Sequence, residues 1–97
     1  MINKVIRTVD GQGRLQLPTE LVNFSSIKDG KEIAICSMKE GTLKLRKIDD
    51  VKNQKIIFLS KMDDKCRFTV PFEIRKEVQE FEIFVLNGDL MLKEAHE

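Results

Sequence analysis

The sequence is short of the residues on which several classes of function depend. Its 97 residues include one His, two Cys and no Trp or Tyr. Structural zinc needs about four Cys or His ligands, and Cys36 and Cys66 show no Cys-x-x-Cys spacing. No nucleophile–base set or phosphate-binding loop is present, and His96 near the end of the chain has no catalytic partner. The sequence therefore predicts no enzyme, catalytic residue, metal, cofactor or small-molecule substrate.

Long apolar stretches and a large net charge are missing as well. No apolar run approaches the roughly 20 residues that span a bilayer, and the first seven residues lack the apolar core of a signal peptide. We therefore expect no membrane partner and a cytoplasmic location. The 17 Lys and Arg balance 16 Asp and Glu, for a net charge of +1. Because phosphate neutralisation supplies much of a nucleic-acid binder's affinity, any DNA site must be a local basic patch.

Proline is also scarce, and the two prolines occupy the same point of a repeated phrase. Residues 10–18, DGQGRLQLP, return as residues 63–71, DDKCRFTVP, so that Pro18 and Pro71 lie 53 positions apart. Such a repeat indicates two copies of one small unit. We predict repeat 1 over residues 1–48, a connector over 49–54 and repeat 2 over 55–97. The repeats should share one core, because a unit of about 45 residues buries too little apolar surface alone.

Each copy predicts the same order of elements. Residues 5–9 and 14–17 flank a turn and predict a β-hairpin. A proline then ends the strand and opens a helix of about two turns, which in the first copy ends near Ser25 and Ser26. A second hairpin follows, joined through Glu40 and Gly41 in the first copy and by the strong turn signal Asn87-Gly88 in the second.

The second hairpins of the two copies can be aligned as well. Residues 32–35 align with 82–85 if the second copy is three residues shorter after its helix, and 41–45 align with 88–92 if three more are removed at the turn. The two copies together contain about eight strands. An open sheet of that size would leave edges exposed, so we expect a closed or sandwiched barrel, mainly β with two short helices.

Residues 5–21, with the short helix and hairpin that follow, resemble the SpoVT/AbrB domain family, which includes AbrB-type transition-state regulators, MazE-type antitoxins and MraZ. The second copy resembles the same unit through Asp63, Arg67, Pro71, Glu73 and Arg75. The resemblance implies tandem units that form one swapped-hairpin (double-split) β-barrel with an internal pseudo-two-fold axis. Whether the barrel closes within one chain or by exchange between two chains stays open.

The resemblance also implies a transcriptional regulator that binds duplex DNA. AbrB-type members bind DNA with basic residues of the first strand, the first hairpin and the short helix. In this sequence those positions hold Arg7, Arg14, Lys61 (beside Ser60), Arg67, Arg75 and Lys76. The first copy has Val22 and Asn23 where the second has its basic helix pair, so the implied footprint is asymmetric.

Each of these basic residues has a structural interpretation beside the functional one. An Asp four residues before Arg14 or Arg67 can stabilise a turn, and it can equally hold the arginine toward a phosphate or base edge. Arg75 and Lys76 can form a solvated helix face or contact phosphates. Arg7, in an apolar strand, is expected to point outward from the barrel.

The cysteines and phenylalanines have expected places too. Cys66 is either a redox-sensitive thiol or an incidental reduced cysteine, and Cys36 is expected to be buried or half-buried. Phe68, Phe81 and Phe84 are expected to fill the core.

A protein-interaction module is the alternative function. The near-neutral charge and the incomplete basic set favour an antitoxin-like or self-associating barrel with little or no DNA binding. Only residues 95–97 follow the last expected strand, so we expect no tail that wraps a toxin. An exposed strand edge or an apolar barrel face would then bind a protein partner or a second copy of the chain.

Overall fold

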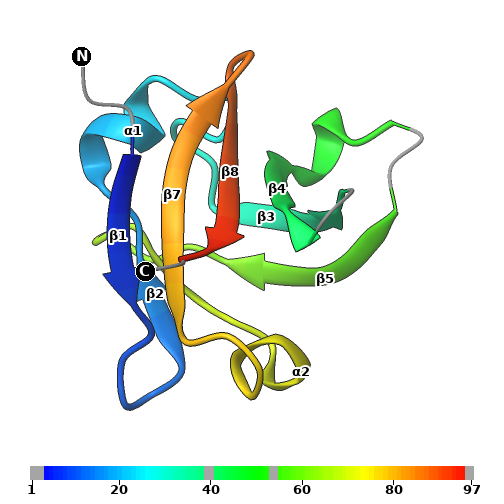
Figure 1. The fold of residues 1–97 in the computed structure, drawn as a ribbon. Coiled ribbons are helices and arrows are strands. Elements are labelled where there is room, and N and C mark those ends of the chain that lie inside the picture. Colours follow the sequence, from blue (N-terminus) through cyan, green and yellow to red (C-terminus); the bar gives the residue numbers. More distant parts are fainter. Residues whose placement is uncertain (1–3, 39–40, 53–54, 96–97) are drawn as a thin grey trace.

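The computed structural model describes residues 4–38, 41–52 and 55–95. Three features named in the sequence analysis lie outside these described residues: His96, Glu40 of one expected turn, and residues 53–54 of the connector. The first half contains β1 (Lys4–Thr8), β2 (Arg14–Gln16), α1 (Thr19–Asn23), β3 (Glu32–Ser37), β4 (Leu43–Lys47) and the 3-10 helix η2 (Ile48–Asp50). The second contains β5 (Ile56–Lys61), β6 (Arg67–Thr69), α2 (Phe72–Arg75), β7 (Glu80–Leu86) and β8 (Asp89–Glu94) (Figure 1). The prediction of a mainly β chain with two short helices is confirmed.

The strands form one six-stranded antiparallel sheet, in the order β1-β7-β8-β4-β3-β5, and a two-stranded ribbon of β2 and β6. The first strand of each half pairs with the other half, β1 with β7 and β5 with β3. The β2–β6 and β4–β8 pairs also join the halves. In Figure 1, β1, β7 and β8 stand side by side, and β3 and β5 run across at a steep angle. Each half therefore takes strand partners from the other.

The first predicted hairpin forms its turn but not its ladder. Asp10 N–H donates to Arg14 O at 2.8 Å, and Gly13 N–H donates to Asp10 O at 3.0 Å. Beyond this turn β1 joins β7 while β2 joins β6, which places Leu15 directly opposite Phe68 in the core. Alternation of polar and apolar residues identified the strands, but it says nothing about which strand lies alongside. The hairpin pairing was therefore wrong.

The second predicted hairpin is confirmed in both halves. Strand β3 pairs with β4, and β7 pairs with β8. Asn87 and Gly88 have φ values of 52° and 85°. Positive φ at both central residues is the requirement of a type I′ turn, and the Asn-Gly sequence meets it.

The strand registers relate the two halves differently from the sequence alignment. Arg7 lies opposite Phe81, and its counterpart Ser60 lies opposite Ile33, so Phe81 and Ile33 hold equivalent places. The second half is thus five residues shorter after its helix and one residue shorter at the hairpin turn. The sequence alignment was wrong by two residues in β7, a shift that leaves every side chain on its expected face and is therefore hard to detect.

One hydrophobic core contains residues of both halves. Leu15 and Phe68 of the ribbon pack against sheet residues that include Ile33, Leu45, Ile83 and Leu92. The apolar residues of the two halves thus lie in one cluster of buried side chains. Each proline precedes a helix as expected, but α1 has five residues and α2 has four, so both are shorter than the two turns predicted, and α1 ends at Asn23, before Ser25.

The predicted core residues are buried with one exception. Phe68, Phe81 and Cys36 are buried. Phe84 is half-buried, because it lies beside its strand partner Lys4 on the face of the sheet that points away from Phe81 and Ile83. In the described part of the chain, no helix is both long and apolar enough to cross a membrane.

Candidate nucleic-acid interface

Two turns with the same hydrogen bonds carry the arginines of the repeated phrase. Asp10 Oδ1 accepts the backbone N–H groups two and four residues later at 2.8 and 2.9 Å. Asp63 Oδ1 accepts the equivalent groups at 2.8 and 2.9 Å. The second carboxylate oxygen faces the arginine: Arg67 Nε is 2.8 Å from Asp63 Oδ2, and Arg14 Nε is 3.5 Å from Asp10 Oδ2. Each aspartate therefore closes its turn. Asp63 also holds Arg67 by a hydrogen bond, whereas Arg14 is paired with Asp10 by charge and its Nε has no hydrogen-bond partner among the described residues.

The β2–β6 ribbon places the two arginines on one face. Arg14 lies opposite Thr69, and Arg67 lies opposite Gln16. Because directly opposite residues share a face and neighbours along a strand alternate, all four lie on the outer face, with Arg14 and Arg67 on a diagonal. The arginine side chains are 31% and 27% exposed. Among the described residues, neither guanidinium donates a hydrogen bond through its Nη groups.

Sequence reasoning missed Gln16 and Thr69 as members of this face. Both are exposed, and Gln16 Nε2 donates to the Lys65 carbonyl at 3.3 Å. The polar–apolar–polar pattern of each short strand was visible in the sequence. It would have identified them once the two strands were known to pair.

The turn hydrogen bonds lower the pKa values of both aspartates. The largest cause is the backbone N–H of Arg14 for Asp10 and that of Arg67 for Asp63, and the guanidinium charges act in the same direction. A carboxyl with a lowered folded-state pKa stabilises the fold above its unfolded pKa of about 3.9. That stabilisation is lost as the pH falls through the folded-state value.

Replacing Asp10 and Asp63 together by asparagine is therefore expected to lower stability in a pH-dependent way. Asparagine keeps a hydrogen-bond acceptor but removes the charge. The urea midpoint of the variant should be below that of the wild type at neutral pH, and the two should converge as the pH falls through the lowered folded-state pKa values, where the wild-type carboxyls become protonated. A difference that is the same at neutral and at low pH would contradict this assignment.

Arg75 reaches across to the first turn from the other half. Its Nη1 donates to the Val70 carbonyl at 2.6 Å, and its guanidinium carbon lies 5.5 Å from the centre of the Phe72 ring. The guanidinium covers Gly13, where an added Cβ would lie 2.9 Å from Arg75 Cζ. Arg75 is thus a structural contact between the halves as well as a candidate phosphate contact. Lys76, at the end of α2, is exposed beside it.

Gly13→Ala is expected to cost about 2 kcal/mol of unfolding free energy. Gly13 has a φ of 80°, where an L side chain costs about 1–2 kcal/mol, and the new Cβ would also displace Arg75. Gly88→Ala is the matched control, because Gly88 has a φ of 85° but open space around it. In urea unfolding, the excess loss at Gly13 should disappear in an Arg75→Ala background; an excess that persists there would assign it to another contact.

The first turn and α2 enclose a groove of about 510 Å³. Its charged lining residues are Arg75 and Lys76 against the single carboxylate of Asp10. The basic helix pair and the first turn, which are far apart in sequence, therefore meet in space.

A counterpart groove of about 300 Å³ lies between the second turn and α1. Val22 and Asn23 replace the basic pair there, and the carboxylates of Asp63 and Asp64 line it together with Asp29 and Lys31. Basic side chains from a helix thus reach only one of the two grooves.

The two remaining predicted residues lie apart from the ribbon's outer face. Arg7 is exposed as expected, but it stands opposite Phe81 and so on the same side of the sheet as the core, not on the opposite side. Ser60, in the equivalent place, donates to Thr69 O at 3.4 Å, so this position adjoins the ribbon. Lys61 lies opposite Glu32 and lines a separate surface depression.

Comparison with protein-family models gave no match, and no curated protein matched the sequence. Among residues 4–38, 41–52 and 55–95, no three His, Cys, Asp or Glu side chains are grouped as a metal ion would require. The candidate interface is therefore defined by its own geometry: Arg14 and Arg67 on the ribbon, and Arg75 and Lys76 at one end of it.

Proposed function

We propose that this chain is a transcriptional regulator of AbrB type that binds duplex DNA, and that its tandem units form one swapped-hairpin barrel. The observation that carries the proposal is the diagonal placement of Arg14 and Arg67 on the outer face of the β2–β6 ribbon. The exchange of β1 and β5 between the halves supports the barrel.

The chemistry of this face suits DNA in three respects. Arg67, which is held through Nε, keeps its Nη groups for a bidentate contact with a phosphate or a guanine edge, and Arg14 presents the same fork across the ribbon. A two-stranded ribbon is narrow enough to enter the major groove, which is about 12 Å wide. Gln16 and Thr69 add uncharged polar groups beside the arginines.

The two ends of the face differ: the basic helix pair lies at one end, and Lys65 of the second turn lies at the other. Arg75 and Lys76 would contact the DNA backbone beside the first turn, while the carboxylates of Asp63 and Asp64 lie at the other end. Phosphate contacts set position and base contacts set sequence preference. The complex should therefore be directional, with DNA shape contributing to recognition.

Titration of a fluorescent duplex of mixed sequence tests this function. Contacts from Arg14, Arg67, Arg75 and Lys76 predict a log–log salt slope of about −3 to −4, at roughly −0.9 per phosphate contact. We expect the polarisation change to saturate at low salt and to weaken steeply as salt is raised. The absence of binding at low salt would overturn the proposal.

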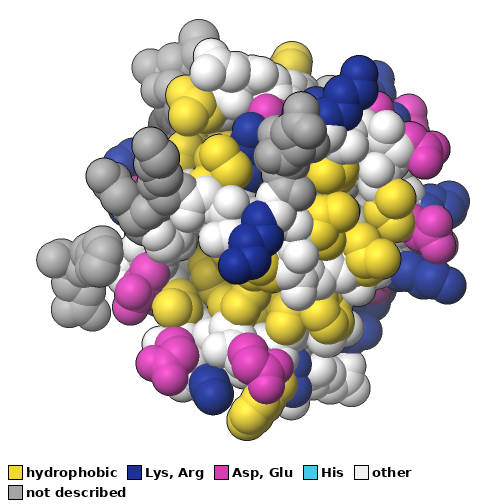
Figure 2. All heavy atoms as spheres, turned by 90° about the vertical axis from the view of Figure 1, so that its right-hand side faces the viewer, with side chains coloured by type: hydrophobic (Ala, Val, Ile, Leu, Met, Phe, Trp, Pro, Cys, Tyr) yellow, Lys and Arg dark blue, Asp and Glu magenta, His cyan; other side chains and the backbone are white. Residues whose placement is uncertain are grey.

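We also propose self-association as a second function, which strand β5 favours. This strand is an edge of the six-stranded sheet, and its residues Ile56, Ile57, Phe58 and Leu59 are 42%, 39%, 37% and 55% exposed. Figure 2 shows hydrophobic side chains gathered across the middle and lower part of the face that contains this strand. An exposed apolar edge strand is a ready template for another strand.

Sedimentation velocity tests this second function. A wild-type dimer that becomes a monomer on Leu59→Lys, and that survives Arg14→Ala with Arg67→Ala, would support pairing of β5 with a second copy. A wild-type protein that stays monomeric across the accessible concentration range would contradict it.

A further inference from the structure

The loop between helix and strand is five residues longer in the first half than in the second, and we take residues 26–30 as the segment without a counterpart. Ile27 within this segment is fully buried and belongs to the core. We call residues 26–30 the Ile27 segment.

The Ile27 segment is fixed at both ends. At one end Ser26 N–H donates to the Gly88 carbonyl at 2.7 Å. At the other end Gly30 packs against Lys47, since a Cβ added to Gly30 would lie 3.1 Å from Lys47 Cγ. The segment therefore runs from the turn of one hairpin to the last residue of the other, with the Ile27 side chain beneath it.

The equivalent place in the second half is a pocket of about 270 Å³. Gly41, the counterpart of Gly88, and Glu94, the counterpart of Lys47, both line it. Its apolar lining comes from Leu43, Ile74, Val78 and Phe81. No described residue of the second half takes the position that Ile27 has in the first.

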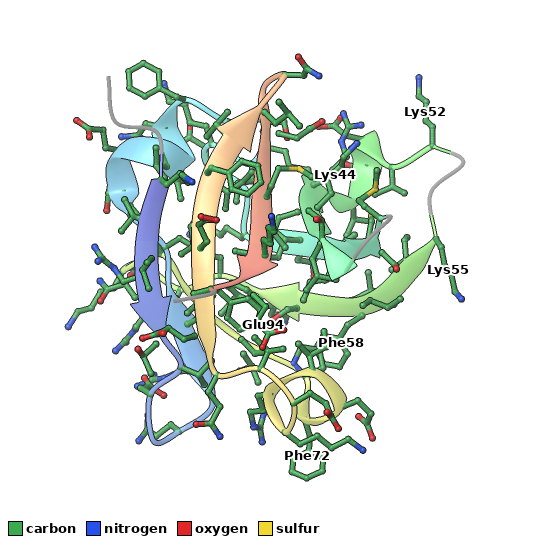
Figure 3. The ribbon with its side chains drawn as sticks, viewed as in Figure 1. Lys44, Lys52, Lys55, Phe58, Phe72 and Glu94 are labelled. Atoms are coloured by element: carbon green, nitrogen blue, oxygen red, sulfur yellow. The ribbon has the colours of Figure 1, made fainter. Side chains whose placement is uncertain are left out.

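The pocket differs from its filled counterpart in charge. The carboxylates of Glu77 and Glu94 line it, together with Lys93. Glu94 extends from the end of β8 toward the side of the molecule that holds α2 (Figure 3). A ligand with a basic group next to its apolar part would complement these carboxylates.

We propose that this pocket binds an aliphatic side chain presented by a short extended segment of a protein partner. The chain's own Ile27 segment indicates the chemistry: a small polar residue, a branched aliphatic residue and then a lysine, as in Ser26-Ile27-Lys28. The small polar residue donates its N–H to the carbonyl of Gly41, the aliphatic side chain enters the apolar pocket, and the lysine lies near the two carboxylates. This site does not depend on DNA binding, because it shares no residue with the ribbon face.

A peptide copy of the chain's own segment is the direct probe. Acetylated and amidated Ser-Ser-Ile-Lys-Asp-Gly is titrated into the full ¹⁵N-labelled chain, beside a control peptide in which Asn replaces Ile. We expect amide shift changes confined to residues around the pocket, with a dissociation constant in the millimolar range, about −4 kcal/mol. The control should bind at least about tenfold more weakly, because it loses the apolar burial.

Two outcomes would overturn the proposal: no shift changes at peptide concentrations of about 10 mM, or equal changes with both peptides. Glu94→Lys provides a variant that leaves the core intact, since Glu94 is exposed. It should weaken binding of the isoleucine peptide by severalfold, while Glu20→Lys, the same charge change at an exposed position that does not line the pocket, leaves it unchanged. Equal effects of these two variants would show that overall charge, not the pocket, governs binding.

Discussion

Replacing both Arg14 and Arg67 by glutamine is expected to lower the affinity for duplex DNA by about 100-fold, since each bidentate arginine contact contributes about 1–3 kcal/mol. Glutamine keeps a polar side chain on the ribbon but removes the charge and the planar fork. The chain should remain folded, because partly exposed ion pairs such as those with Asp10 and Asp63 contribute little to stability. Fluorescence polarisation with a labelled duplex measures the loss, and circular dichroism verifies the fold.

The matched control also removes two positive charges, but at positions away from the ribbon. Lys28 and Lys52 are exposed and do not line the groove of the first turn. Replacing both by glutamine should change the affinity by less than about threefold at moderate salt, where charges beyond about 10 Å are screened. If this control loses as much affinity as the arginine variant, DNA is attracted by the net charge of the chain and the ribbon has no special role.

Helix starts and turns were predictable from the sequence, whereas the pairing of strands from different halves was not. Pro18 and Pro71 marked the helix starts, and Asn87-Gly88 marked its hairpin, because each constrains its own backbone. The neighbours of β1 and β2 depend on how apolar faces from both halves fit together. A strand period of two residues specifies a face and leaves the partner undetermined.

The candidate site shows the same contrast between local features, which were predictable, and long-range contacts, which were not. The Asp10–Arg14 and Asp63–Arg67 turns were visible in the sequence, since each involves residues four positions apart. The contact of Arg75 with Gly13 joins residues from different halves, and no local pattern indicates it.

The packing of each turn against its helix accounts for the different residues at equivalent places in the two turns. Gly13 and Cys66 occupy the same place and both have positive φ, 80° and 61°. Gly13 lies beneath Arg75, whereas the helix residue in the groove beside Cys66 is Val22. The large Arg75 thus lies over a turn that has glycine at this place, whereas the smaller Val22 lies beside a turn that has the Cys66 side chain there. The asymmetry of basic residues is therefore built into the packing between the halves.

Ile27→Ala is expected to be among the most destabilising single substitutions in the chain, at about 3 kcal/mol within the range of 2–5 for buried Ile to Ala. Ile27 is 0% exposed, and its backbone is fixed by the Ser26 contacts with Gly88 and Asp89. The surrounding chain cannot easily collapse into the space that the side chain leaves. Urea unfolding monitored by circular dichroism measures the loss.

Val78→Ala is the matched control from the second half. Val78 packs against the core but is only partly buried, and it lines the pocket that corresponds to the Ile27 position. Removing two methyl groups there should cost about 1 kcal/mol, because water can enter the enlarged pocket and no closed cavity forms. Equal losses at the two positions would mean that the pocket is as well closed as its counterpart. The smaller loss expected at Val78 reflects its smaller side chain and the open pocket beside it, whereas at Ile27 the chain itself completes the core.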